Sequence, residues 1–390
     1  MATLLIHSGA LYTPFEVIED GALLARDGRI EWAGARAEVA KEKADTEIDV
    51  AGRLICPGFV DLQVNGGGGA FLTEEPSPES LERIARAHVR FGTTALLPTI
   101  ITTDEATTLR ALEAVREATS RPPAGARVLG SHLEGPFINP KKRGAHEERH
   151  IQPPRLELLE RFLQAAGDSL RLITLAPELP GALELIAAAK EAGAAIALGH
   201  TDATLEEAQA AIDAGASAGT HIFNAMRALH HREPGVAGAL LDDERVVATV
   251  IADGVHVHPS GLRIVARAKG AAGTALVTDA MPPAGTDVSS FTLGGRSVSV
   301  RDGACNLEDG TLAGSVLTMN RAVDVMHREA GVPLRECIEM ATATPARVLG
   351  LQGEIGVLAP GARADVVVLN DDMSVWRVFV GGEPAYDAGA

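Results

Sequence analysis

The sequence predicts an α/β protein: a (β/α)8 TIM-type barrel with a small β-sandwich formed by the N- and C-terminal segments. Three observations support this fold class. The centre of the chain alternates short apolar runs with helical patterns rich in Ala, Glu, Leu and Arg, as expected of a parallel barrel. Both ends of the chain carry strand-like runs punctuated by Gly, Asp and Pro. With 390 residues, the chain has room for one large domain and one small one.

The two chain ends share a strand-and-turn pattern. Asp27-Gly28 marks a hairpin in the first segment, and Pro360-Gly361 and Gly381-Gly382 mark turns in the last one. Because the first segment is too short to bury much core by itself, we expect residues 1–56 and 350–390 to form one small domain. The strand-like runs are 3–7, 21–25, 29–33, 364–369 and 375–380.

Residues 57–349 are predicted to form the barrel domain. A doubly wound open sheet is the alternative, but we find no Gly-rich phosphate loop that opens a helix. The run Gly66-Gly67-Gly68-Gly69 lacks a following Gly-Lys-Ser/Thr and is interpreted as a flexible turn. The predicted strands are 59–64, 94–99, 127–132, 172–176, 195–199, 216–221, 246–252 and 275–278, and the helical patterns include 78–91, 103–119, 155–166, 182–192 and 205–214. After the eighth strand we expect a hairpin near 294–300 and helices near 320–330 and 333–341.

Composition limits the class of partner. Hydrophobic residues make up 46% of the chain and aromatic residues only 3%, so Ala, Val, Leu and Ile must fill the core. The formal net charge of −17 argues against broad binding to nucleic acid or to anionic membranes, which needs basic patches. A small anionic substrate stays compatible with this charge, because one local cluster of donors can hold a phosphate. We therefore expect a small-molecule partner.

The cysteines and the first residues bear on location. Cys56, Cys305 and Cys337 are odd in number and far apart, which predicts neither a disulfide framework nor a cysteine metal site. The stretch Met1 to Gly9 lacks a basic region followed by a long apolar one. No apolar run approaches the roughly 20 residues needed to span a bilayer. The expected location is the cytoplasm.

Three residues of metal-ligating types stand at the ends of three predicted strands. Glu134, His200 and His221 each stand where a strand ends, and barrel chemistry gathers at the carboxyl ends of the strands. A carboxylate with two imidazoles suits a divalent zinc or iron ion that keeps an open coordination position. Such an ion lowers the pKa of a bound water to about 7. Each residue alone could simply close a strand, but the set of three predicts a metal site.

Asp279 ends the eighth strand and would face the same barrel mouth. A carboxylate there can take a proton from water and deliver it to a leaving nitrogen, as general acid–base catalysis requires. A helix or turn cap before Ala280-Met281-Pro282-Pro283 is the alternative interpretation.

Seven motifs run in order along nearly the whole chain. They are Pro57-Gly58-Phe59-Val60-Asp61-Leu62-Gln63-Val64-Asn65-Gly66, His132-Leu133-Glu134-Gly135-Pro136-Phe137, Leu198-Gly199-His200-Thr201, Thr220-His221-Ile222-Phe223-Asn224-Ala225-Met226, Arg232-Glu233-Pro234-Gly235, Ile251-Ala252-Asp253-Gly254-Val255-His256 and Val277-Thr278-Asp279-Ala280. Together they resemble the amidohydrolase superfamily and, within it, the N-acetylglucosamine-6-phosphate deacetylase family. The second and fourth motifs are specific, whereas the Pro-Gly-Phe-Val-Asp part of the first marks only the superfamily.

This resemblance implies hydrolysis of the acetamide of N-acetylglucosamine 6-phosphate, giving glucosamine 6-phosphate and acetate in amino-sugar catabolism. It implies metal ligation by Glu134, His200 and His221. It implies an acid/base role for Asp279, and for His146 a substrate contact that polarises the acetyl carbonyl.

The resemblance also implies a homodimer, in which Arg232 reaches the substrate phosphate in the neighbouring subunit. An arginine fork is a reasonable phosphate clamp inside an acidic protein. The other substrate contacts that the resemblance implies are Ala145, Asn224, Ala225, Asp253, His256, Leu312, Ala313 and Gly314.

One departure from the superfamily bears on the number of metal ions. Many members carry His-x-His on the first strand, and some add a carboxylated lysine on the fourth. This chain has Gln63-Val64-Asn65 on the first strand and no lysine in 172–177. Because glutamine is a poor ligand beside histidine, we expect one divalent ion per subunit, zinc first and iron as the alternative. Gln63 and Asn65 would then lie beside that ion or hold a weak second one, and His258 has no assigned role.

Two other functions stay open at this point. A different amidohydrolase, acting on another N-acyl or cyclic amide, would need a binuclear or differently lined site. A non-catalytic barrel that binds protein partners would be expected to have lost metal ligands, whereas this chain keeps all three and Asp279.

Overall fold

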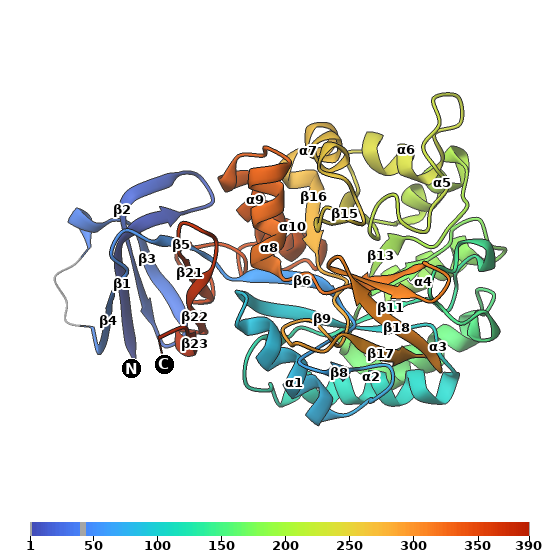
Figure 1. Cartoon of the computed structure of the whole chain (residues 1–390), viewed down its shortest axis with the longest axis horizontal. Coiled ribbons are helices and arrows are strands. Elements are labelled where there is room, and N and C mark those ends of the chain that lie inside the picture. The colour runs from blue at the N-terminus through green and yellow to red at the C-terminus, as the bar shows by residue number, and fades with distance from the viewer. Residues whose placement is uncertain (1, 40–43, 390) are drawn as a thin grey trace.

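The computed structural model describes residues 2–39 and 44–389. Figure 1 shows a small sheet, built from both chain ends, beside a larger barrel. Residues 1, 40–43 and 390 of the predicted small domain lie outside the described residues. The predicted fold class is confirmed.

The small sheet joins strands from both ends of the chain. Its strand order is β23-β22-β21-β5-β1-β2-β3, and β4 pairs with β1. Strand β5 connects the two ends, because it pairs in parallel with β1 and antiparallel with β21. Buried side chains from both ends, among them Ile6, Leu23, Ile55, Val368 and Phe379, share one hydrophobic core. The strands are β1 (Thr3–Tyr12), β2 (Val17–Arg26), β3 (Arg29–Ala35), β4 (Thr46–Asp49), β5 (Leu54–Pro57), β21 (Val366–Leu369), β22 (Val375–Val380) and β23 (Glu383–Asp387).

Eight parallel strand positions form the barrel. They are β6 (Phe59–Val64), β9 (Thr93–Ile101), β10 (Arg127–Val128) continued by β11 (Ser131–Glu134), β12 (Leu170–Leu175), β13 (Ala195–Leu198), β14 (Ala218–Gly219), β15 (Val247–Ile251) and β16 (Thr274–Val277). Gly130, with φ of 143°, lies between β10 and β11, which together replace the continuous strand predicted at 127–132. The barrel closes between its last and first strands, where the Asp279 amide donates to the Gln63 carbonyl at 2.9 Å.

Helices cover the outside of the barrel (Figure 1). Their starts are set by local side-chain caps: Ser77 and Asp104 accept from backbone amides, and Thr204 and Glu207 form a capping box. The helices are α1 (Pro78–Val89), α2 (Glu105–Ser120), α3 (Leu156–Ala166), α4 (Ala182–Glu191), α5 (Leu205–Ala214), α6 (Gly235–Asp242), α7 (Pro259–Gly273), α8 (Met319–Asp324), α9 (Leu334–Ala341) and α10 (Ala343–Val348). None of the helices in the described part of the chain has both the length and the apolar character needed to span a bilayer.

An inserted sheet follows the eighth barrel strand. Its four antiparallel strands are β17 (Ser290–Leu293), β18 (Arg296–Arg301), β19 (Ala304–Leu307) and β20 (Leu312–Ser315). The hairpin predicted at 294–300 is therefore only part of a larger element. Leu293, Val298 and Leu307 pack with Phe71 and Met281, which holds the inserted sheet against loops of the barrel. A two-stranded ribbon of β7 (Gly66–Gly67) and β8 (Ala70–Phe71) lies in one of those loops.

Candidate metal and substrate site

A cavity of about 370 Å³ lies at the carboxyl ends of the barrel strands, within the usual range of small-molecule sites. Loops after six of the barrel strands and the inserted sheet contribute to its wall. Its lining is Asn65, Ile101, Glu134, Lys141, Lys142, Gly144, Ala145, His146, His200, His221, Asn224, Ala225, Met226, Ile251, His256, Asp279, Met281, Leu293, Thr311, Leu312, Ala313 and Gly314.

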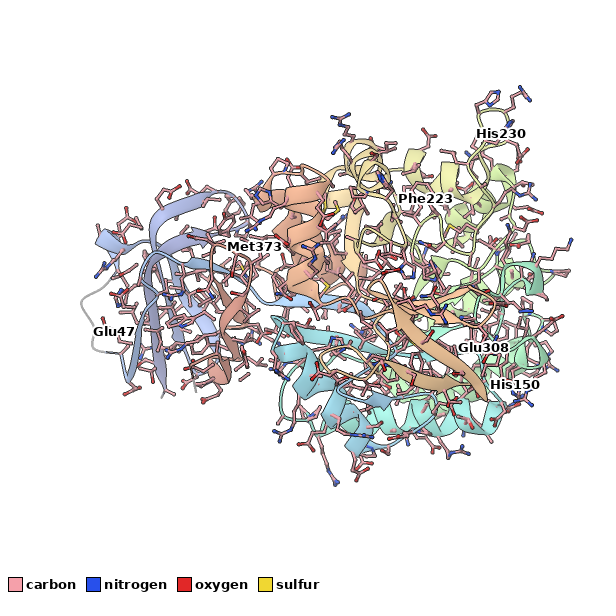
Figure 2. The ribbon with its side chains drawn as sticks, viewed as in Figure 1. Glu47, His150, Phe223, His230, Glu308 and Met373 are labelled. Carbon is pink, nitrogen blue, oxygen red and sulfur yellow. The ribbon has the colours of Figure 1, made fainter. Side chains whose placement is uncertain are left out.

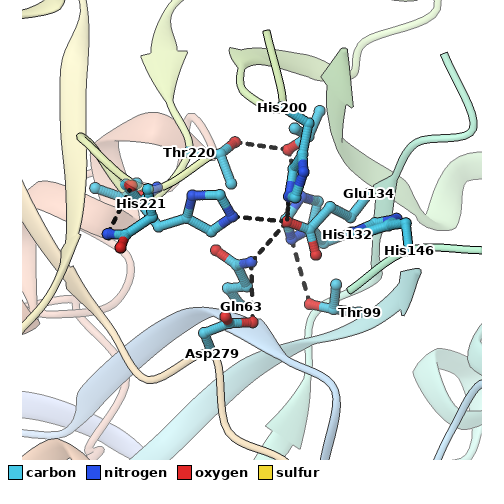
Figure 3. A network of polar contacts seen from close by, with 12 residues as sticks. Gln63, Thr99, His132, Glu134, His146, His200, Thr220, His221 and Asp279 are labelled. Carbon is cyan, nitrogen blue, oxygen red and sulfur yellow. Dashed lines mark hydrogen bonds and ion pairs between the residues drawn. The ribbon is translucent and has the colours of Figure 1, made fainter. Parts of the chain in front are cut away.

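The three predicted metal ligands meet in this cavity. Glu134 Oε1 lies 3.2 Å from Nε2 of His200 and 3.0 Å from Nε2 of His221, as Figure 3 shows. All three side chains are buried, and their ligand atoms lie within 4.8 Å of one another. One carboxylate oxygen and two imidazole nitrogens form a donor set that suits zinc or iron.

The position of the ring hydrogen on His200 determines whether its Nε2 atom can bind a cation. His200 Nδ1 lies 2.9 Å from the carbonyl oxygen of Lys142 and therefore donates its hydrogen there. In the neutral ring, the Nε2 lone pair then faces the carboxylate of Glu134. Two electron-rich atoms at that distance are stable only with a proton or a metal ion between them, so the residues fit a divalent cation.

Electrostatics within the set point the same way. Burial by itself raises the pKa of Glu134, but the imidazoles of His200 and His221, when protonated, donate to the carboxylate and by their charge hold that pKa well below its usual range. Burial lowers the pKa of His221, yet the hydrogen bond and charge of Glu134 raise it overall. The carboxylate is therefore ionised and ready to bind a cation.

Both histidine ligands have strained backbones. His200 has φ of 50° and His221 has φ of 33°, in the left-handed region that non-glycine residues rarely occupy. Hydrogen bonds hold these conformations: the Asn139 amide donates to the His200 carbonyl at 2.9 Å, and the His221 amide donates to Thr249 Oγ1 at 2.8 Å. Strain of this kind clusters at functional sites, where the surroundings fix it.

Asp279 lies across the mouth, held by two amides. Its Oδ1 accepts from Asn65 Nδ2 at 2.7 Å and from Gln63 Nε2 at 3.1 Å. The same Gln63 nitrogen donates to Glu134 Oε1 at 3.0 Å, so it links the two carboxylates. Burial and the charge of Glu134 raise the pKa of Asp279 to about 6. Such a carboxylate is suited to exchanging protons near neutral pH.

His146 lines the cavity beside His200, with ring centroids 4.4 Å apart. The backbone amide of Thr102 donates to His146 Nδ1 at 3.3 Å, and Thr102 Oγ1 lies 2.8 Å from the same nitrogen. Nδ1 therefore accepts, and the ring hydrogen is on Nε2. Because burial lowers the pKa of His146 to about 3, the ring is neutral and presents an Nε2–H donor.

Most of the predicted substrate contacts line the cavity. Ala145, Asn224, Ala225, His256, Leu312, Ala313 and Gly314 all do so. Asp253 is not among the lining residues; instead its Oδ2 lies 2.6 Å from His256 Nδ1, and its Oδ1 accepts from the His256 amide at 2.8 Å. Asp253 thus orients a lining residue.

Arg232 does not reach the cavity of its own chain. It lies on the exposed loop before α6, where its guanidinium is 2.9 Å from His231 Nε2. Figure 2 shows the neighbouring His230 at the outer tip of this loop. His258, for which the sequence suggests no role, is the N-cap of α7 and accepts from the Ser260 amide at 3.1 Å.

Several residues at the site were not predicted from the sequence. Lys141 and Lys142 line the cavity, and Lys142 Nζ lies 3.4 Å from Asp202 Oδ1. His132 lies inside the barrel two residues before Glu134 and is 2.8 Å from Thr174 Oγ1. The Lys-Lys-Arg run before Gly144 was a visible signal for a basic wall, whereas nothing in the sequence signals the partners of His132.

Comparison with known proteins agrees with this geometry. Residues 54–385 match the Amidohydrolase family. The N-acetylgalactosamine-6-phosphate deacetylase of Shewanella sp. (strain ANA-3) is 40% identical over 393 residues, covering 99% of this chain and 97% of the relative. The N-acetylglucosamine-6-phosphate deacetylase of Bacillus subtilis (strain 168) is 36% identical over 388 residues, covering 98% and 97%. Among solved structures, a mutant N-acetyl-D-glucosamine-6-phosphate deacetylase from Mycobacterium smegmatis, in complex with N-acetyl-D-glucosamine-6-phosphate, matches with a TM-score of 0.92 at 34% identity, covering 99% of this chain and 100% of that one.

Proposed function

The chain belongs to the amidohydrolase family, and we propose that it hydrolyses the acetamide of N-acetylglucosamine 6-phosphate to glucosamine 6-phosphate and acetate. One observation carries the proposal: the donor atoms of Glu134, His200 and His221 lie together, in a geometry that suits a cation, and face Asp279 across a cavity at the barrel mouth. The deacetylases that resemble this chain span nearly its full length.

The metal is proposed to be one divalent ion per subunit, held by Glu134, His200 and His221. Zinc is the first candidate and iron the second, because both accept nitrogen and oxygen ligands. Gln63 supports a single ion, because it stands where a histidine could ligate a second one and its amide nitrogen instead donates to Glu134. When bound, such an ion polarises a carbonyl oxygen and lowers the pKa of water.

The side chains around the ion have separate tasks. Asp279 takes the proton from the attacking water and returns it to the leaving nitrogen. Gln63 and Asn65 hold its carboxylate in place. The Nε2–H of His146 donates to the acetyl oxygen as negative charge develops there, which is where a fixed donor gives the most stabilisation.

A homodimer is proposed to complete the phosphate site. Arg232, exposed on its loop, would bind the phosphate in the neighbouring subunit, together with that subunit's own His256. A charge-assisted hydrogen bond contributes about 1.5 to 3 kcal/mol, so Arg232→Ala should raise KM by roughly 10- to 100-fold with a smaller change in kcat. Arg267→Ala, which removes an exposed arginine of α7, is the control. An unchanged KM in Arg232→Ala would contradict the clamp, and a monomer in solution would contradict the dimer.

N-acetylgalactosamine 6-phosphate is a second candidate substrate, because the relative that is 40% identical carries that name. The two sugars differ only in the configuration at C4, away from the acetamide. The same site could therefore cleave either one. Cytoplasmic location also remains a prediction.

Acetate release by the zinc-loaded protein tests the function. We expect turnover of N-acetylglucosamine 6-phosphate, and at least about tenfold lower kcat/KM on the unphosphorylated sugar, because each 1.36 kcal/mol of lost phosphate binding is worth a factor of ten. The galactosamine epimer in the same assay ranks the two candidates. Absence of acetate from both phosphorylated sugars would refute the proposal, and turnover of a cyclic amide instead would favour another amidohydrolase activity.

A further inference from the structure

We propose that Glu178 is a positioning residue that strengthens metal binding by holding His200 in place. Glu178 lies in the loop between β12 and α4, and it is not among the residues that line the cavity. It is neither one of the proposed metal ligands nor one of the proposed substrate contacts. The inference rests on the metal site of the proposed function and does not depend on the identity of the substrate.

The Glu178 carboxylate joins the two loops that surround His200. Its Oε1 accepts from Asn139 Nδ2 at 2.8 Å and from the Asp202 amide at 2.6 Å. Its Oε2 accepts from Thr201 Oγ1 at 2.5 Å. Asn139 belongs to the loop after β11, whereas Thr201 and Asp202 directly follow His200. One side chain thus connects the loop that follows ligand Glu134 to the loop that begins with ligand His200.

The loop after β11 wraps around His200 itself. The Asn139 amide donates to the His200 carbonyl, and the Lys142 carbonyl accepts from His200 Nδ1, each at 2.9 Å. The first contact fixes the backbone and the second fixes the ring and its tautomer. Glu178 holds Asn139 against the segment after His200, so it stabilises both contacts. Partners of this kind tune the affinity of a metal site through its ligands.

The backbone of His200 makes this support necessary. Its left-handed φ of 50° costs on the order of 1 to 3 kcal/mol and persists only where the surroundings enforce it. By accepting from the Asp202 amide and the Thr201 hydroxyl, Glu178 fixes the two residues that follow the strained His200. Without those bonds, the segment can relax and draw His200 Nε2 away from Glu134.

The hydrogen-bond donors around Glu178 explain why a carboxylate suits this position. Three donors converge on Glu178, and a carboxylate offers two oxygens that only accept. The neighbouring Asp202 carboxylate has its own cations, with Lys142 Nζ at 3.4 Å and the Arg227 guanidinium at 3.5 Å. Glutamine keeps one accepting oxygen, and its amide nitrogen can donate to a rotated Thr201 hydroxyl. We therefore expect Glu178→Gln to be mild and Glu178→Ala to be severe.

Zinc affinity, measured on metal-free protein by competition with a chromophoric chelator, tests the proposal. Glu178→Ala should raise the zinc Kd by about 10- to 100-fold, as the loss of a ligand-orienting partner usually does. Glu178→Gln should fall between Glu178→Ala and the parent chain. The matched control is Glu354→Ala, which removes another partly buried glutamate, paired with Arg363 at 3.0 Å. The control should leave the zinc Kd unchanged.

The thermal midpoint separates positioning from a general structural role. A positioning role predicts that added zinc raises the Tm of Glu178→Ala less than that of the parent chain, because stabilisation by a ligand follows its affinity. Equal zinc Kd values in the two proteins would overturn the proposal, even if the metal-free Tm of the variant is lower. A parent chain that binds no zinc would overturn it as well. Weakened zinc binding without acetate release from any sugar phosphate would leave this inference standing and refute the proposed substrate.

Discussion

The two halves of the cavity mouth carry carboxylates in opposite settings. On one side, at the carboxyl ends of β11, β13 and β14, Glu134 faces two imidazoles, which hold its pKa well below the usual range. On the other side, at the carboxyl ends of β6 and β16, Asp279 faces two amides, and burial beside Glu134 raises its pKa to about 6. The first arrangement suits a cation, and the second suits a group that holds or releases a proton. Environment, not residue type, assigns the two roles.

Gln63 connects the two halves. Its amide nitrogen donates to both Glu134 and Asp279, at 3.0 and 3.1 Å. A histidine in this place could ligate a second ion, whereas the Gln63 amide nitrogen bridges the two carboxylates as a neutral donor. Because the two halves use different residues, we expect that one substitution can remove metal binding and another can remove proton transfer.

The largest effect is expected from the metal half. His200→Ala should remove the bound ion, and a catalytic metal supplies several kcal/mol of transition-state stabilisation, so kcat/KM should fall by at least about a thousandfold. Metal content by mass spectrometry and acetate release are measured together. His150→Ala is the control, because His150 lies outside the set of residues that line the cavity. Full metal content with full activity in His200→Ala would show that this half is wrongly assigned.

The second-largest expected effect separates proton transfer from metal binding. Asp279→Asn should reduce kcat by about 10²- to 10⁴-fold, the usual contribution of a positioned acid or base. Because Asp279 is not one of the three ligands, the variant should keep the metal content of the parent chain. Asparagine also tolerates the left-handed φ of 50° at this position. Unchanged kcat would remove the proton-transfer role, and loss of the ion would show that the halves cannot be separated.

The smallest effect concerns the tuning of Asp279. Asn65 donates to its carboxylate and so lowers the pKa that burial raises. Asn65→Ala removes this donor from the ionised form, so the pKa of Asp279 should rise. If the ionised form is the active base, the acid limb of kcat/KM then moves to higher pH, by about one unit for a hydrogen bond to a charged group.

A pH profile of kcat/KM checks this shift, with Asn306→Ala as the control. The Asn306 side chain bonds within the inserted sheet, to the Ala304 carbonyl. A downward shift of the acid limb in Asn65→Ala would contradict the sign of this assignment. Equal shifts of the acid limb in both variants would show that the shift comes from a general change in the fold and not from the pKa of Asp279.

The barrel and the meeting of Glu134, His200 and His221 could be predicted from the sequence. Strand and helix patterns alternate regularly, and residues that end parallel strands gather at one mouth whatever the loops do. The inserted sheet was only partly predicted, because its outer strands are short and lie beside turns that hide their pattern. The role of Arg232 is still a prediction, and so are the domain limits at residues 57 and 349.

The contacts that support the site could not be predicted. Glu178 meets Asn139, Thr201 and Asp202, which lie 39, 23 and 24 residues away in the chain. No periodic pattern links these positions, since the loops that bring them together are irregular. The placement of Asp253 behind His256 likewise depends on the turn they share. Motifs predict which residues reach the mouth, but not which residues hold them there.

The pairing of β5 with β21 has a consequence for synthesis of the chain. Cys56 lies opposite Val367, 311 residues later. During synthesis, the sheet formed by the first strands therefore has an unpaired edge at β5 until the whole barrel has been made. Unpaired strand edges attract other chains, and contacts this distant in sequence form slowly. The nascent chain should thus depend on chaperones most strongly just before its last strands emerge.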